Sequence, residues 1–177
     1  MNMRILLSIL LIGTVTIVLA QDDLAEKAQE YFGKGLNAYN AGDYAGAVAW
    51  YSKCIELDSL TMNVRFNRAT TYLRMRDLPK AKDDLDFILE RQPELLNARM
   101  QRAVVQAEMG LSMLALEDLN TVIRQDSTFP KAYLMRGRLR ARALGDEQGA
   151  CADLKEALKL GDRSAESYMS PACRESK

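Results

Sequence analysis

The side chains of this chain that could carry chemistry are its arginines, its carboxylates and three cysteines, because none of its 177 residues is a histidine. Histidine is the commonest general base in catalysis and the commonest metal ligand in proteins. The acidic residues do not follow the spacing of a calcium-binding loop, and residues 145–149 lack the spacing of a nucleotide-binding turn. We therefore predict a protein that is not an enzyme and that holds neither a metal nor a cofactor.

Arginine and aspartate recur together at matching places in the chain, and this pattern predicts structural ion pairs. The three predicted pairs join Arg68 to Asp84, Arg102 to Asp118, and Arg136 to Asp153. The arginines are 34 residues apart, and the matching segment upstream has Lys34 and Trp50 and so lacks both partners. A partly shielded pair contributes about 1–3 kcal/mol and an exposed pair about 0–1 kcal/mol. The alternative is that each charge is solvated independently.

The three cysteines indicate one buried thiol and one candidate disulfide. Cys54 stands on an apolar helical face, where it would behave as a small hydrophobic side chain. Cys151 and Cys173 flank the last predicted helix and the C-terminal tail, and they could pair in an oxidising compartment. A disulfide between residues 22 apart would contribute about 3 kcal/mol. Two free thiols are the alternative.

Residues 1–20 have the composition of a secretory signal peptide. One positive charge at Arg4 precedes an apolar run over residues 5–18, and Val18 and Ala20 are the fairly small residues expected before a cleavage site. The run is shorter than the roughly 20 residues that cross a bilayer. We therefore predict cleavage after Ala20, no membrane span in the mature chain, and an exported protein that is periplasmic in a Gram-negative bacterium or secreted. An uncleaved membrane anchor is the alternative.

A repeat of 34 residues runs from residue 28 to residue 162 and predicts the elements that position these side chains. Phe32, Phe66, Met100 and Leu134 stand at the same place in successive segments. Each segment has two runs of apolar residues at helical spacing with a turn between them, at Gly42 in the first segment. This repeat predicts stacked helical hairpins, because one hairpin cannot bury its own apolar face.

Small residues at two places in each segment carry a resemblance to a known family. The eighth place holds Gly35, Ala69, Ala103 and Gly137, and the twentieth holds Ala47, Ala81, Ala115 and Ala150. Small side chains suit these places because the two helices of a hairpin cross there, and larger ones would hold them apart. The pattern resembles the tetratricopeptide repeat (TPR).

The resemblance implies an all-α fold in which four helix-turn-helix repeats build a right-handed α-α superhelix, a TPR solenoid. The four repeats would cover residues 28–61, 62–95, 96–129 and 130–162. A lead-in of residues 21–27 would precede them. Residues 163–177 would follow as a short capping helix and tail, with Pro171 ending the helix, because the last repeat needs a cover for its apolar face.

Two of the departures from the family pattern affect the turns between helices. Arg76 stands where the family has glycine, so we predict a left-handed backbone with a strain on the order of 1 kcal/mol. The fourth repeat has one extra residue around residues 144–146, which predicts a slightly longer turn between its helices.

The resemblance also implies a concave groove, lined by the first helices of the repeats, that receives an extended peptide or a partner helix. The residues expected to line it are Phe32, Leu36, Tyr39, Phe66, Thr70, Leu73, Arg74, Met100, Val104, Leu134, Arg138 and Arg142. They change from apolar and aromatic in the first repeat to basic in the fourth, which predicts a protein or peptide ligand with an apolar anchor and an acidic segment. The alternative is that the apolar residues pack between repeats and the arginines form a solvated face.

Two functions fit such a chain. The first is an exported adaptor that binds a peptide or protein in the groove, and the second is a structural subunit of a larger envelope assembly, docked through its convex face or edges. Nucleic acid is not an expected partner, because 24 basic and 24 acidic residues leave no net charge. The pattern indicates neither an oligomeric state nor the identity of the ligand.

Overall fold

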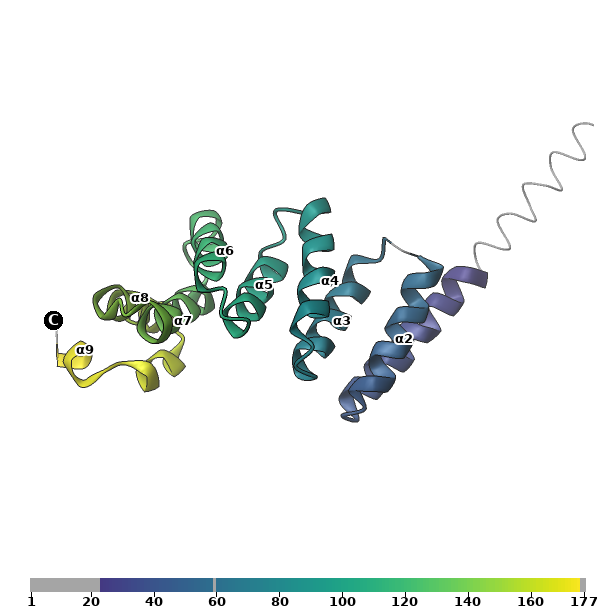
Figure 1. Ribbon diagram of the computed structural model, residues 1–177, viewed down its shortest axis with the longest axis horizontal. Helices are drawn as coiled ribbons and strands as arrows, with labels where there is room; N and C mark the ends of the chain where they lie inside the picture. The colour runs from purple at the N-terminus through teal and green to yellow at the C-terminus, as the bar shows by residue number, and fades with distance from the viewer. Residues whose placement is uncertain (1–22, 59, 176–177) are drawn as a thin grey trace, which may run out of the picture. The chain divides into compact units, whose positions relative to one another are not determined.

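The computed structural model of the protein describes residues 23–58 and 60–175, and every regular element in these residues is a helix (Figure 1). The predicted signal peptide of residues 1–20 lies outside the described residues. The chain forms two compact units that divide between Met75 and Arg76. None of the helices described is both long enough and apolar enough to cross a membrane.

In the first unit, two helices of the first repeat pack closely and a third follows. They are a helix over residues 23–40, α2 (Tyr44–Leu57) and α3 (Met62–Arg74). Gly42, at φ 80°, makes the turn, and the Asp43 carboxylate caps α2 by accepting a hydrogen bond from Gly46 N at 2.8 Å. A Cβ atom at Gly35 would lie 2.5 Å from the buried Tyr51 ring, which is why this place must be small.

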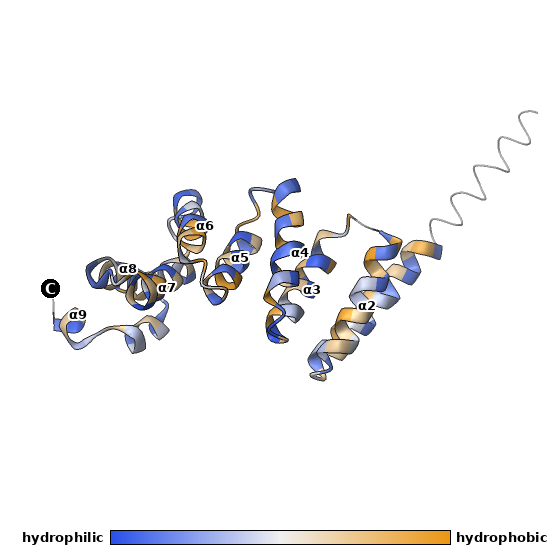
Figure 2. Ribbon diagram, viewed as in Figure 1, coloured by the Kyte–Doolittle hydropathy of each residue, from blue (hydrophilic) through white to orange (hydrophobic). Residues whose placement is uncertain are grey.

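The second unit continues the helical hairpins to the chain end. Its elements are α4 (Leu78–Arg91), α5 (Leu96–Glu108), α6 (Ser112–Gln125), α7 (Pro130–Leu139), η1 (Arg140–Leu144), α8 (Glu147–Lys159), η2 (Arg163–Tyr168) and α9 (Pro171–Glu175). Figure 2 shows apolar and polar residues alternating along these helices, as in amphipathic helices. One core cluster joins α5, α6 and α7 through Met100 and Leu119, and another joins α7 and α8 through Leu134 and Leu154.

The extra residue of the fourth repeat lies in η1, a π-helical turn that extends α7. Gly145, at φ 65°, ends this turn, and Asp146 caps α8 by accepting a hydrogen bond from Gly149 N at 2.8 Å. The slightly longer turn that was predicted here is therefore a wider turn of the helix and not a longer loop. A π turn holds one residue more than an α turn, so the helix itself accommodates the insertion.

Arg76 has a left-handed backbone, at φ 63°, and is the one residue other than glycine with a positive φ among those described. Gly42 and Gly110 stand at the same place in the first and third repeats, with φ 80° and 77°. The predicted strain, on the order of 1 kcal/mol, is therefore present at Arg76.

The chain end covers the apolar face of the last repeat with two short elements. Ala165 of the 3₁₀ helix η2, Met169 and Cys173 are buried against α7 and α8. The predicted short helix is present as η2, which ends before Pro171, and Pro171 begins a further helix, α9, that was not predicted. Proline suits the first helical position because its missing N–H would have no partner there and its φ already fits a helix.

Candidate functional site

A cavity of about 260 Å³ lies between α5, α7 and η1. Its lining residues are Val104, Ala107, Glu108, Met135, Arg138, Leu139, Arg142 and Ala143. Most of these side chains are apolar, while the charged groups come from one carboxylate and two guanidiniums. A concave apolar surface with a few charged groups is the usual form of a ligand site.

The two arginines of this cavity have no carboxylate partner among the described residues. The Arg138 guanidinium carbon lies 4.5 Å from the centre of the Tyr168 ring, and its Nη1 lies 3.9 Å from Met135 Sδ. Its Nε is buried and makes no hydrogen bond within the described chain. Arg142 is exposed. Both guanidiniums can therefore donate hydrogen bonds to an anionic ligand without first breaking an ion pair.

Glu108 is the one carboxylate among the residues that line the cavity, and it is already paired. Its Oε2 accepts a hydrogen bond from Arg76 Nη1. Arg76 itself does not line the cavity. The pair joins the residue with the left-handed backbone to the end of α5.

The structure gathers three of the predicted groove residues, Val104, Arg138 and Arg142, around this cavity. Met100 and Leu134 do not line it, because they are buried, with exposed fractions of 5% and 7%. Each packs into a core cluster between helices. Their burial favours the alternative of a packing role, and ligand contact by these two residues stays a prediction.

The other predicted groove residues belong to the first unit, where aromatic side chains pack in pairs. Phe32 packs against Tyr51 and borders a separate hollow of about 810 Å³ beside Leu24 and Cys54. Tyr39 packs against Tyr44, with ring centres 5.5 Å apart, and accepts a hydrogen bond from Arg74 Nε at 3.4 Å. Of the rest, Leu36 is exposed, and Phe66, Thr70 and Leu73 are half-buried. These side chains offer an apolar surface within their own unit.

Two of the three predicted ion pairs form within the second unit. Arg102 donates from Nε and Nη2 to Asp118, both at 2.8 Å, and Arg136 donates in the same way to Asp153 at 2.9 and 2.6 Å. The paired aspartates are 3% exposed, so these forks are shielded from water. Hydrogen bonding, chiefly to Asp118, raises the pKa of the Arg102 guanidinium. Arg68 and Asp84 belong to different units, and their pairing stays a prediction.

Partners that the spacing did not predict complete this network. Each of the three arginines also donates from Nη1 to the second helix of the preceding repeat: Arg68 to Ser52 at 2.9 Å, Arg102 to Asp86 at 2.9 Å, and Arg136 to Asn120 at 2.7 Å. A second arginine joins each fork, Arg99 at Asp118 and Arg140 at Asp153. The sequence did contain a signal for these contacts, because a polar residue recurs every 34 positions, at Ser52, Asp86 and Asn120.

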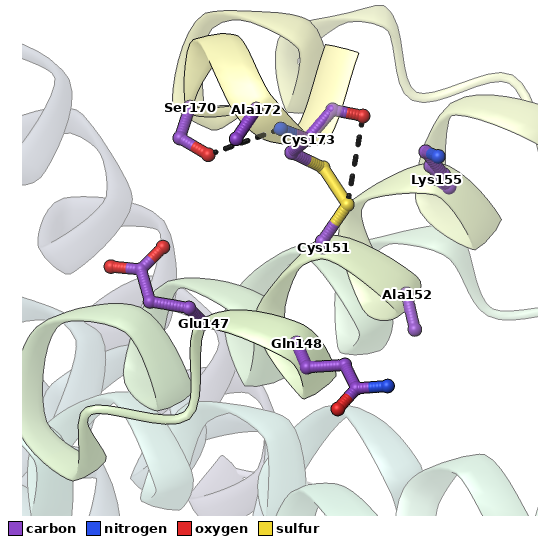
Figure 3. Close-up of a pocket in the computed structure, with 8 residues that line it drawn as sticks. All are labelled: Glu147, Gln148, Cys151, Ala152, Lys155, Ser170, Ala172 and Cys173. Carbon is purple, nitrogen blue, oxygen red and sulfur yellow. Dashed lines mark hydrogen bonds between the residues drawn. A yellow bond between two sulfur atoms is a disulfide. The ribbon is translucent and has the colours of Figure 1, made fainter. Parts of the chain in front are cut away.

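Cys151 of α8 and Cys173 of α9 form a disulfide that holds the cap on the last repeat (Figure 3). The backbone N–H of Cys173 donates to Ser170 Oγ at 3.3 Å, and a hollow of about 470 Å³ borders the bond. Cys54 is a free, buried thiol whose Sγ donates to Ala28 O at 3.3 Å. Burial raises the pKa of the Cys54 thiol. The described residues contain no group of three or more cysteine and acidic side chains placed to hold a metal.

Comparison with known sequences finds the same repeat. A family model of the tetratricopeptide repeat matches residues 28–59. Human sperm-associated antigen 1 is 32% identical over 104 residues, which are 58% of this chain and 11% of that protein. A tetratricopeptide repeat and J domain-containing co-chaperone of Cryptococcus neoformans is 35% identical over 86 residues, 49% of this chain and 16% of that protein. The chain therefore spans only a small part of these curated relatives.

Solved structures share the fold at low sequence identity. MamA matches with a TM-score of 0.71 and 17% identity over 77% of this chain and 74% of that chain. A thermophilic TPR protein of Thermus thermophilus matches with a TM-score of 0.69 and 22% identity over 80% of each chain. These likenesses extend over the helical hairpins well beyond the one repeat that the family model matches. The chain therefore contains a tetratricopeptide repeat at residues 28–59, and it shares the fold of stacked helical hairpins with these solved structures.

Proposed function

We propose that the protein is a non-enzymatic adaptor of the cell envelope that binds a protein or peptide on the concave face of its repeats. The TPR fold supports a role in protein–protein interaction. The observation that carries the proposal is the cavity between α5, α7 and η1, where Arg138 and Arg142 have no carboxylate partner in the described chain. A charged side chain at an apolar hollow is a common feature of a recognition site.

The chemistry of the cavity favours a ligand with an apolar anchor beside an acidic group. Val104, Met135 and Leu139 offer apolar surface, and a guanidinium binds a carboxylate through two parallel hydrogen bonds. An acidic peptide segment, or the carboxylate at the end of a chain, supplies both features. The cavity alone is small, so the rest of such a ligand would extend along the neighbouring repeats.

Two features support an exported location, in the periplasm of a Gram-negative bacterium or outside the cell. Residues 1–20 have the composition of a cleavable signal peptide. The disulfide between Cys151 and Cys173 fits an oxidising compartment, since cytosolic reductants keep most thiols reduced. Thiol counting on protein isolated without reductant, in denaturant, is expected to find one thiol. Three thiols would contradict the disulfide and remove its support for the exported location.

Affinity capture with residues 21–177 tests the adaptor function. The wild type is compared with Arg138→Glu/Arg142→Glu, which reverses the charge of the cavity, and with Met113→Ser/Leu114→Ser on α6 as a matched surface control. We expect the charge-reversal variant to lose the captured partner and the α6 variant to retain it. A partner that both variants retain contradicts binding in the cavity.

One observation favours the alternative, a structural subunit of an envelope assembly. Leu111, Met113 and Leu114 at the start of α6 are exposed by 37%, 68% and 46%, and they form an apolar patch outside the cavity. Such patches often mark a protein interface. Under this alternative the same capture gives the opposite result, because the partner is lost in the α6 variant and retained in the charge-reversal variant.

A further inference from the structure

The charged residues that line the cavity have a net positive charge, and the pairing of its one carboxylate with an arginine outside the lining makes the cavity more positive still. Its lining residues contain one acid, Glu108, and two bases, Arg138 and Arg142. Glu108 stands at the end of α5 and accepts its hydrogen bond from Arg76, a residue that does not line the cavity. If Glu108 were unpaired, its carboxylate would compete with a ligand for the two guanidiniums and would repel a ligand carboxylate.

Arg76 forms this ion pair although its backbone is left-handed, a conformation that glycine adopts at the same place in the first and third repeats. Gly42 and Gly110 occupy the same place with φ 80° and 77°, and glycine adopts such angles without strain. Arg76 has φ 63° and adds the one feature that a glycine lacks, a guanidinium within reach of Glu108. A strained residue that makes a contact beside a candidate site is a reason to ask whether the contact serves that site.

We infer that Arg76 is a specificity-determining residue of the proposed ligand site: by holding Glu108 in an ion pair, it lets Arg138 and Arg142 select a ligand that carries carboxylates. The inference rests on the proposed function and deepens it. Arg76 acts through Glu108 and does not touch the ligand. The side chains of Arg76 and Glu108 are 70% and 37% exposed, so the effect is moderate and weakens with added salt.

The test uses two hexapeptides of alternating residues, one of leucine and glutamate and one of leucine and glutamine. The measured quantity is the ratio of their dissociation constants for residues 21–177 at low salt. Arg76→Gly restores the residue found in the first and third repeats, so the variant is expected to fold. Arg76→Lys keeps a positive charge in place, and Arg124→Gln on α6 removes one charge at a residue that does not line the cavity.

We expect the wild type to prefer the glutamate peptide and Arg76→Gly to reduce that preference about 3–10-fold, with little change for the glutamine peptide. Arg76→Lys and Arg124→Gln should retain most of the preference. The double variant Arg76→Gly/Glu108→Gln should regain it, because the carboxylate that Arg76 neutralised is gone.

The outcomes separate this inference from the function on which it rests. An unchanged preference in Arg76→Gly, or an equal loss in Arg124→Gln, overturns the role of Arg76 and leaves the proposed site intact. A double variant as weak as Arg76→Gly also overturns it. A wild type that binds neither peptide, or both equally, contradicts the acidic ligand and the inference together.

Discussion

Arg136 and Arg138 stand two residues apart on α7, and each guanidinium lies over a tyrosine ring, yet their hydrogen-bond partners differ. The Arg136 side chain is 15% exposed, donates twice to Asp153 and once to Asn120, and joins neighbouring helices. Arg138 stacks on Tyr168, borders the cavity and has no carboxylate partner in the described chain. Two residues along an α-helix turn through about 200°, so one helix presents the two guanidiniums on nearly opposite sides.

The comparison shows that arginine side chains have two different roles in this protein. A buried guanidinium is stable only where its hydrogen bonds are satisfied, so Arg102 and Arg136 lie among aspartates and act in the fold. Arg138 and Arg142 line the cavity, where a ligand can accept hydrogen bonds from them, and Arg138 Nε is buried without a partner in the described chain. Loss of a partner in the first group should therefore change stability, and a substitution in the second should change binding.

The largest expected effect follows removal of Asp118, the buried acceptor for Arg99 and Arg102. Asp118→Ala leaves two guanidiniums without their shared carboxylate, and breaking a buried pair in this way costs about 3–5 kcal/mol. The free energy of unfolding from urea titrations measures it. Glu117→Ala, at the exposed neighbouring position on α6, is the control and should change stability by less than about 0.5 kcal/mol. Equal costs for the two variants would show that the paired arginines do not stabilise the fold.

The next effect concerns the disulfide that holds the cap. Cys151→Ser/Cys173→Ser should lower the free energy of unfolding by about 3 kcal/mol, because the bond restricts the unfolded chain over a separation of 22 residues. Reductant should destabilise the wild type by a similar amount and leave the double variant unchanged. A wild type that is equally stable with and without reductant would mean that the cap does not depend on the bond.

The sequence predicted the contacts that recur with the 34-residue repeat. It did not predict the contacts that depend on the conformation of one side chain or on the course of the C-terminal cap. Arg102 and Asp118 recur at fixed places, so their pairing follows from the periodicity. The contact between Arg76 and Glu108 joins residues 32 apart through the reach of one long side chain, and no other repeat has the arginine. The stacking of Tyr168 on Arg138 depends on the route of the cap, which lies outside the repeat.

Burial was the harder property to predict for the groove. Met100 and Leu134 share their place in the repeat with Phe32 and Phe66, and the family pattern assigns that place to the ligand. In this chain Met100 packs between the third and fourth hairpins, and Leu134 packs between the fourth hairpin and the C-terminal cap. The neighbouring side chains decide whether an apolar residue at such a place packs inward or faces a ligand. The periodicity of the sequence does not show which side chains will be its neighbours.

Arg138 belongs to the arginines without a carboxylate partner in the described chain. Arg138→Ala should weaken binding of the leucine–glutamate peptide about 10-fold, a loss of about 1.4 kcal/mol in binding free energy. The same variant should lower the free energy of unfolding by about 1 kcal/mol or less, since the contact with the Tyr168 ring is lost but no ion pair is broken. Arg138→Lys keeps the charge but cannot form two parallel hydrogen bonds, so its affinity should lie between those of wild type and Arg138→Ala. A loss of stability without a loss of affinity would place Arg138 in the structural group.

The smallest effect tests how Arg138 is held. Its guanidinium lies 4.5 Å from the centre of the Tyr168 ring, and such a contact at a partly exposed site contributes about 0.5–1 kcal/mol. Tyr168→Ala should therefore weaken binding of the leucine–glutamate peptide about 2–5-fold, because Arg138 becomes free to move, while Tyr168→Phe keeps the ring and should bind like the wild type. In an Arg138→Ala background, Tyr168→Ala should have no further effect. An additional loss there would mean that Tyr168 contacts the peptide itself, and the positioning role would then be wrong.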